Sequence, residues 1–172
     1  TALIETMVTL PDLEQRLKSS LEEGGRVADR ASPPLAGLRQ QWHGLRQERR
    51  DKLQELTRRY ASFLQDSVIA QRHGRPVLAV KAGAVGQISG QVHDSSASGN
   101  TVFVEPRSVL TMGNKLVDLE ARIRKEEQRV LAELSALVGQ DEPVLNSLVE
   151  ILLTLDLALA RGRYGRWLGG TP

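Results

Sequence analysis

Residues 92–106, VHDSSASGNTVFVEP, place small polar residues and a glycine between two short apolar segments. Serine, asparagine and glycine favour a tight turn, so residues 95–100 are expected to connect two strands. The β-branched run 101–104 predicts the second of these strands. Pro106 has no N–H to donate, so we expect it to halt the strand pairing and occupy the first turn of a helix, with Glu105 near its positive end.

Working outward towards the N-terminus, residues 65–106 hold further short apolar runs with glycines between or within them. The runs lie at 68–70, 76–80 and 88–92. Short β-branched runs punctuated by glycine are typical of strands joined by tight turns. Residues 65–106 are therefore predicted to form a small insert of three or four antiparallel strands.

Long helical patterns flank this insert. Before it, apolar residues recur every three or four positions, and a charged residue, Arg49, interrupts the pattern at its centre. The apolar residues are Leu35, Leu38, Trp42, Leu45, Leu53, Leu56, Tyr60 and Phe63. After it, a second stripe has the same spacing, at Val109, Met112, Leu116, Leu119, Ile123, Val130, Leu134 and Leu137. Such spacing places apolar side chains on one helix face. Two long helices of similar length predict an antiparallel pair with the insert at its far end.

The two ends of the chain also have helical patterns. In residues 2–21, apolar side chains recur every three or four positions, which predicts helix. Pro11 is expected to begin a second helix within this segment, and the glycines at 24–25 are expected to end that helix. Residues 144–168 are densely apolar, which predicts the most buried helix.

We therefore expect a mainly α fold with a small antiparallel β insert. Its predicted parts are a helical bundle base, two long antiparallel lever helices and a short β clamp-like tip. The predicted division is 1–64 for the helical core and first lever helix, 65–106 for the insert, and 107–172 for the second lever helix and a return helix into the core.

The composition excludes several classes of protein. Only 3% of residues are aromatic, which favours packing of helices over an aromatic-rich β-sandwich. The absence of cysteine removes disulfides and thiolate-bound metals. No apolar stretch approaches the ~20 residues that span a bilayer, so no membrane partner is expected. The chain starts at Thr1 without methionine, and we interpret it as a piece of a longer protein.

Basic residues gather in two regions. Residues 33–64 hold seven Lys/Arg against three acids, and Arg39, Arg46, Arg50 and Arg58 form a candidate nucleic-acid-binding ridge. A solvated helix face with internal ion pairs is the alternative. In the insert, Arg72, Arg75 and Lys81 are candidate phosphate contacts. Three acids of the insert, Asp66, Asp94 and Glu105, balance their charge. The alternative is therefore that these cations are solvated surface residues that bind no ligand.

The sequence offers no catalytic or metal site. His93, Asp94 and Ser95 are the residue types of a hydrolase triad, but neighbours on a strand point to opposite faces. Asp94 and Ser95 are instead expected to cap their own turn. Three histidines far apart in sequence predict no metal site. The chain has no glycine-rich loop with a following lysine that would hold a nucleotide, so we expect no cofactor and no catalysis in this chain.

The segment 92–106 resembles the signature GxVHDxSxSGxTxFxEP of MutS-II proteins, the second bacterial MutS family, and residues 72–81 resemble that family's RxGRxVxxVK strand pair. Weaker matches at 29–35 and 156–164 extend the resemblance over nearly the whole chain. Pro76 departs from the usual residue there, which suggests a strand start or edge. The residues of the chain within or beside the signature, for which a structural role is expected, are His93, Asp94, Ser95, Ser98, Gly99, Thr101, Glu105 and Pro106. His93 is also a candidate nucleic-acid contact.

The resemblance implies a dimeric, ATP-driven clamp of the cytoplasm. ATP and Mg²⁺ would bind an ATPase domain absent from this chain, and a nuclease-like domain often closes such proteins. The family is mismatch-repair-like, and its members are associated with branched DNA, with suppression of recombination, and with splitting stalled ribosomes. The chain would then be a core, lever and clamp region that binds branched or duplex DNA and transmits force. A ribosome-contacting arm and a plain helical interaction module are the alternatives.

Overall fold

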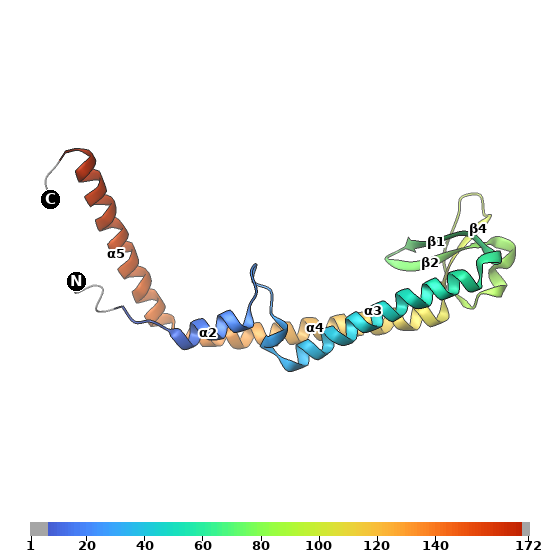
Figure 1. Cartoon of the computed structure of the whole chain (residues 1–172), viewed down its shortest axis with the longest axis horizontal. Helices are drawn as coiled ribbons and strands as arrows, with labels where there is room; N and C mark the ends of the chain where they lie inside the picture. The colour runs from blue at the N-terminus through green and yellow to red at the C-terminus, as the bar shows by residue number, and fades with distance from the viewer. Residues whose placement is uncertain (1–6, 170–172) are drawn as a thin grey trace. The chain divides into compact units, whose positions relative to one another are not determined.

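In the computed structural model, which describes residues 7–169, most of the chain is helical and four strands form one antiparallel sheet (Figure 1). Short 3-10 turns link several of these elements. The helices are α2 (Pro11–Ser20), α3 (Pro33–Arg59), α4 (Arg107–Gln140) and α5 (Glu142–Trp167), and the strands are β1 (Leu64–Arg72), β2 (Arg75–Lys81), β3 (Gly90–Ser95) and β4 (Thr101–Pro106).

The chain divides into two compact units, with one boundary just before α3 and the other inside α4. The first, here called the sheet unit, is residues 33–127, and the second, called the end-helix unit, is residues 1–32 and 128–172. The prediction of a mainly α fold with a small antiparallel insert is confirmed. The three-part division of the chain remains a prediction.

The sheet has the strand order β1-β2-β4-β3, and all neighbours are antiparallel. β1 and β2 form a hairpin in which Arg72 pairs with Arg75. Its two turn residues, His73 and Gly74, both have positive φ, as a two-residue hairpin turn requires. β3 carries a bulge between Val92 and Asp94, so His93 has no partner on β4. A bulge of this kind redirects a side chain.

The core of the sheet unit lies between α3, the sheet and the start of α4. It is built from residues of every one of these elements: Leu53, Leu56, Leu64, Leu78, Val80, Ile88, Val104 and Val109. Leu53 and Leu56 are one helical turn apart and therefore present one face to the sheet. The predicted strands and the predicted apolar face of the first long helix are confirmed here.

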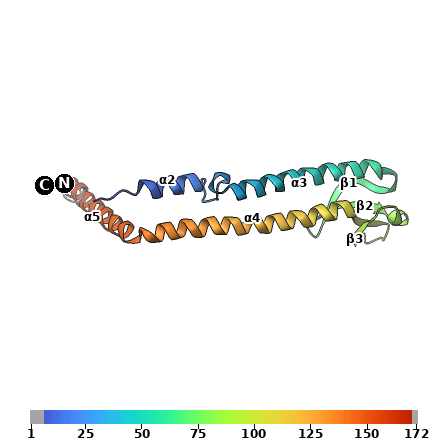
Figure 2. The ribbon, with the colours of Figure 1, turned by 90° about the horizontal axis from the view of Figure 1, so that it is seen from below.

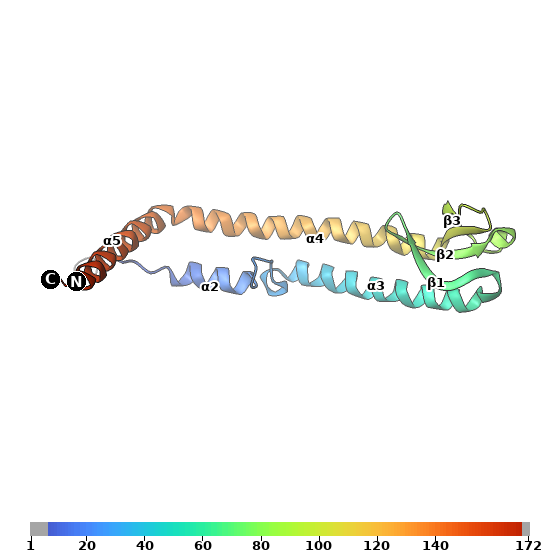
Figure 3. The ribbon, with the colours of Figure 1, turned by 90° about the horizontal axis from the view of Figure 1, so that it is seen from above.

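Within the sheet unit, α3 and the first part of α4 lie side by side and run in opposite directions (Figures 2 and 3). Two contacts fix their register: Arg39 reaches Glu127, and Trp42 reaches Glu120. The first helix is shorter than expected, because α3 ends at Arg59 and a 3-10 turn precedes β1. Pro106 closes β4 and is not in the helix, since α4 begins at Arg107.

In the end-helix unit, α2 begins at Pro11 as predicted and ends at Ser20. The glycine cap predicted at 24–25 is wrong: Leu21 is already extended and forms an isolated bridge with Val27. The positive φ angles of Gly24 and Gly25 serve the turn that closes this bridge. Val27, Ala28, Val130 and Leu134 are buried.

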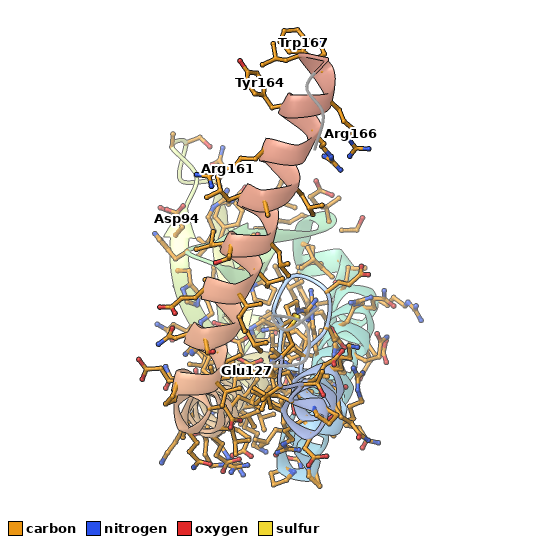
Figure 4. All side chains as sticks on the ribbon, turned by 90° about the vertical axis from the view of Figure 1, so that its left-hand side faces the viewer. Asp94, Glu127, Arg161, Tyr164, Arg166 and Trp167 are labelled. Atoms are coloured by element: carbon orange, nitrogen blue, oxygen red, sulfur yellow. The ribbon has the colours of Figure 1, made fainter. Side chains whose placement is uncertain are left out.

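The expectation that residues 144–168 form the most buried helix is wrong for the structure as described, since α5 has no buried residue. Its exposed apolar side chains include Val149, Leu152, Leu153, Leu157 and Leu159. These positions fall on more than one face of the helix, so a single neighbouring element could not cover them all. In Figure 4 the side chains of Tyr164 and Trp167 project from its last turns.

By length and composition alone, α5 is also apolar enough to cross a membrane, so the prediction that no apolar stretch approaches the spanning length is wrong. A single helix of this kind is weak support for a membrane span, because the core helices of soluble proteins have the same composition.

Candidate nucleic-acid interface

A fully buried carboxylate, Glu105 of β4, lies at the centre of the polar groups of the sheet unit. The bulge in β3 turns His93 towards it, and His93 Nε2 lies 2.8 Å from Glu105 Oε2. From β2, Arg75 places Nη1 3.6 Å from Glu105 Oε1. That distance is an ion pair but too long for a hydrogen bond, and both atoms are buried without a hydrogen-bond partner. Burial of a carboxylate is costly unless polar groups pair with it, and His93 and Arg75 are the side chains that do so here.

The two long helices complete this cluster. Arg75 Nη2 donates a hydrogen bond to Asn114 Oδ1 of α4 at 3.1 Å. Arg49 of α3 is half-buried and has no hydrogen bond or ion pair among the described residues. Desolvation by burial lowers the pKa of Arg49, and the nearby charge of Glu105 opposes that shift. The cluster therefore joins the sheet to α4 by a hydrogen bond, and it interacts with α3 through the charges of Glu105 and Arg49.

Gly113 of α4 makes room for this contact. A Cβ atom at this position would lie 2.8 Å from Arg75 Nη1 and 3.5 Å from Glu105 Oε1. The absence of a side chain thus lets the Arg75–Glu105 pair lie directly against the helix.

Further along the helix pair, two carboxylates of α4 contact side chains of α3. Arg39 Nη2 donates to Glu127 Oε1 at 2.6 Å, and Trp42 Nε1 donates to Glu120 Oε1 at 3.0 Å. The guanidinium of Arg46 lies over the Trp42 ring, 5.0 Å from its centroid. These contacts hold α3 against α4 and leave Arg46 exposed to solvent.

On the sheet, Arg72 is held between two neighbours. Its guanidinium lies 3.8 Å from the centroid of the Phe103 ring, and its Nε lies 3.2 Å from Asp94 Oδ2. A cation held against an aromatic face and a carboxylate at once has little freedom to reach a ligand.

The turn between β3 and β4 is stabilised from within. Asp94 Oδ1 accepts a hydrogen bond from the Ser95 amide at 2.8 Å, as the predicted capping role requires. Ser96 contributes more than Ser95 does: its Oγ accepts from the Thr101 amide at 3.1 Å. Ser98 Oγ lies 3.3 Å from Ser96 Oγ, and Gly99 supplies the positive φ. These contacts account for a structural role of the signature residues in this turn.

The residues predicted to contact nucleic acid therefore have different surroundings. Arg39, Arg72, Arg75 and His93 each face a carboxylate. Lys81 is exposed and donates to the Ser62 carbonyl at 3.0 Å. Arg46 and Arg50 are exposed on α3, and no carboxylate pairs with either among the described residues. The structure does not bring these seven residues together on one surface.

Sequence reasoning treated Arg49 only as a break in an apolar stripe and did not single out Arg107 or Gly113. The position of Arg49 was itself a signal, because a charge on the buried face of a helix requires a partner. The sequence around Gly113 gives no sign of its role, because that role depends on the side chain of Arg75, which lies on a strand distant in sequence. Among residues 7–169 no group of three His, Asp or Glu side chains could hold a metal ion.

Comparison with known proteins gives several relatives that share a name, and no family model matches the chain. A protein named Endonuclease MutS2 from Synechocystis sp. is 45% identical over 170 residues, which is 99% of this chain and 21% of that protein. Proteins of the same name from Pelotomaculum thermopropionicum and Halalkalibacterium halodurans are 40% and 38% identical, over 94% and 96% of this chain and 21% of each relative. The chain is therefore similar, over nearly all its length, to a segment that makes up about one fifth of MutS2 endonucleases.

Proposed function

We propose that the sheet unit is the nucleic-acid-binding arm of a MutS2-type protein and that it binds phosphates rather than base edges. One observation carries this proposal. The sheet unit holds fifteen Lys and Arg against ten Asp and Glu, a net charge of +5, whereas the end-helix unit holds eight against eleven, a net charge of −3. The small overall charge of the chain conceals this separation. A concentrated positive charge attracts the phosphates of nucleic acids.

The exposed cations of α3 fit this role best. Arg46 and Arg50 are four residues apart, so they lie on neighbouring turns of the same helix flank. Both keep exposed guanidinium groups, which can donate two parallel hydrogen bonds to a phosphate. Arg39 continues the same flank but is neutralised by Glu127. The proposal therefore moves the candidate contacts away from Arg39, Arg75 and His93.

The buried cluster at Glu105 supports a second, mechanical part of the proposal. Because Arg75 pairs with Glu105 within the sheet and donates to Asn114 of α4, a displacement of α4 would be carried to the sheet through these contacts. In the complete protein, an ATPase domain outside the present chain would bind ATP and Mg²⁺ and drive this displacement within a cytoplasmic homodimer. The sheet would then act as the tip of a clamp around branched DNA.

Binding of the whole chain to a four-way DNA junction, compared with a linear duplex of equal length, tests the proposal. We expect tighter binding to the junction, and a loss of affinity of about tenfold when Arg46 and Arg50 are both replaced by Gln. The matched control is the double replacement of Arg16 and Arg26 by Gln. It removes the same charge from exposed positions of the end-helix unit and should change the affinity little.

Two outcomes would contradict the proposal. Equal losses in the two variants would mean that net charge alone, and no particular surface, is responsible. No binding to either DNA at low salt would exclude a DNA-binding arm in this chain. If structured RNA bound where DNA did not, the result would favour the ribosome-contacting alternative.

A further inference from the structure

A second basic surface lies where α3 ends and α4 begins, away from Arg46 and Arg50 in sequence. Two clefts adjoin there and share Ser89 and Arg107. The larger, about 290 Å³, is lined by Lys52, Leu56, Arg59, Tyr60, Ile88, Ser89, Pro106, Arg107 and Ser108. The smaller, about 240 Å³, is lined by Ser89, Gly90, Gln91, Arg107 and Leu110. Together they form a groove that runs from the last turns of α3, past the start of α4, to the edge strand β3.

The cations of this groove differ in whether they are paired. Lys52 Nζ lies 2.7 Å from Glu55 Oε2, so its charge is already compensated. This hydrogen bond is the main reason that the pKa of Glu55 is lowered, and the charge of Arg59 adds to the effect. Arg59 and Arg107 are exposed, and among the described residues neither has a carboxylate within ion-pair distance, although the charge of Glu55 acts on Arg59. Arg59 only covers the ring of Tyr60, at 5.7 Å from its centroid.

The remaining lining of the groove also suits an anion. No carboxylate lines either cleft in the part of the chain that the structure describes. Ser89 and Ser108 supply hydroxyl groups, and Ser108 belongs to the first turn of the 34-residue helix α4, whose backbone dipole is positive at that end. This lining contrasts with the cleft at Trp42, Arg49 and Arg75, where Glu120 opposes an anion.

The lining indicates phosphates in preference to bases. Tyr60 is the one aromatic residue of the groove as described, and Arg59 already lies over its ring. A base therefore has no free aromatic face on which to stack. Each cleft exceeds by several times the roughly 30 Å³ that one water occupies, so both have room for a phosphate group.

We propose that this groove binds the sugar-phosphate backbone of a nucleic-acid strand, with Arg59 and Arg107 as the principal contacts and the Ser89 and Ser108 hydroxyls as secondary donors. The inference rests on the proposed function of the sheet unit and adds a second, separate contact surface to it. Because the groove contacts backbone and not bases, its binding is independent of sequence.

The test compares the whole chain with two double variants, Arg59→Gln with Arg107→Gln, and Arg122→Gln with Lys125→Gln. The second pair is the matched control: it removes the same charge from exposed positions of the sheet unit outside the groove. Affinity for a DNA junction is measured across a salt series, and circular dichroism confirms that each variant is folded. We expect the groove variant to lose about tenfold in affinity, and the slope of its log K against log salt concentration to become shallower by about two. The control variant should change little in both measurements.

The outcomes separate this inference from the function on which it rests. If the wild-type chain binds the junction and the groove variant matches the control, the groove is not a contact surface, although the proposed function stands. If the wild-type chain binds no DNA, both fail together. Inorganic phosphate serves as a separate probe of the wild-type chain: if it binds through Arg59 and Arg107 while affinity for the junction does not depend on them, the groove is a site for free phosphate and the inference is overturned.

Discussion

The sheet unit and α5 of the end-helix unit are both rich in leucine and valine, yet their apolar side chains have opposite surroundings. Leu78 in the sheet is 1% exposed, whereas Leu153 in α5 is 64% exposed. In the sheet unit, each apolar stripe occupies one face and meets a stripe from another element. In α5, apolar residues occupy several faces. The contrast shows that burial follows from how apolar residues are arranged and what partners they have, and not from their number alone.

The two units differ equally in their charges. In the sheet unit, a buried carboxylate organises the cations around it, while exposed arginines remain on α3 and at the start of α4. The end-helix unit carries an excess of acids. The first three predictions test the packing of the sheet unit, the second of them in direct comparison with α5, and the last measurement tests the difference in charge.

The largest effect is expected from Glu105→Ala. Removal of the buried carboxylate leaves His93 and Arg75 without their shared partner, which should destabilise the sheet unit by about 3–5 kcal/mol. Urea unfolding followed by Trp42 fluorescence, in a Trp167→Phe background, reports on this unit alone. Glu105→Gln keeps the volume and should cost less. A loss below about 1 kcal/mol for Glu105→Ala would mean that the cluster does not hold the unit together.

A pair of leucine truncations compares the packing of the two units directly. Leu78→Ala opens a cavity in the core of the sheet unit and should cost about 2–5 kcal/mol. Leu153→Ala removes an exposed side chain and should change stability by no more than about 0.5 kcal/mol. Denaturation curves of the two variants, followed by circular dichroism, measure both values. A large loss for Leu153→Ala would show that α5 is covered in solution, for example by a second copy of the chain.

The smallest effect is expected from glycine substitutions in the long helices. Gly44→Ala meets no atom within 4 Å and should stabilise α3 by up to about 1 kcal/mol. Gly113→Ala gains the same helix propensity but forces the guanidinium of Arg75 away from Glu105, so we expect a net loss of about 1 kcal/mol. Thermal unfolding of the two variants gives opposite shifts. Equal stabilisation by both would mean that Arg75 moves aside without cost.

The elements of the sheet unit were predictable because local signals agreed with the packing. The turn at 95–100, the β-branched strands and the leucine stripe of α3 each indicated the structure that formed. The prediction for α5 failed because apolar density was taken to mean burial, although density does not show which element would cover the helix. The role of Gly113 lay beyond sequence reasoning, since it depends on Arg75, which is distant in sequence.

Among the candidate contacts, residue type alone could not separate free cations from paired ones. Arg39 and Arg46 looked equivalent in the sequence, but Glu127 neutralises the first and no carboxylate pairs with the second among the described residues. Arg59 and Arg107 are far apart along the chain, and only the fold brings them to one groove.

The central claim is that the sheet unit binds nucleic-acid phosphates. Its most direct test is the slope of log K for DNA binding against log salt concentration. With contacts from Arg46, Arg50, Arg59 and Arg107, the whole chain should show a slope of about −3.6 on duplex DNA, from about 0.9 for each phosphate neutralised. Replacement of all four by Gln should bring the slope close to zero. A shallow slope for the wild-type chain, or a steep slope that survives the four replacements, would contradict the claim.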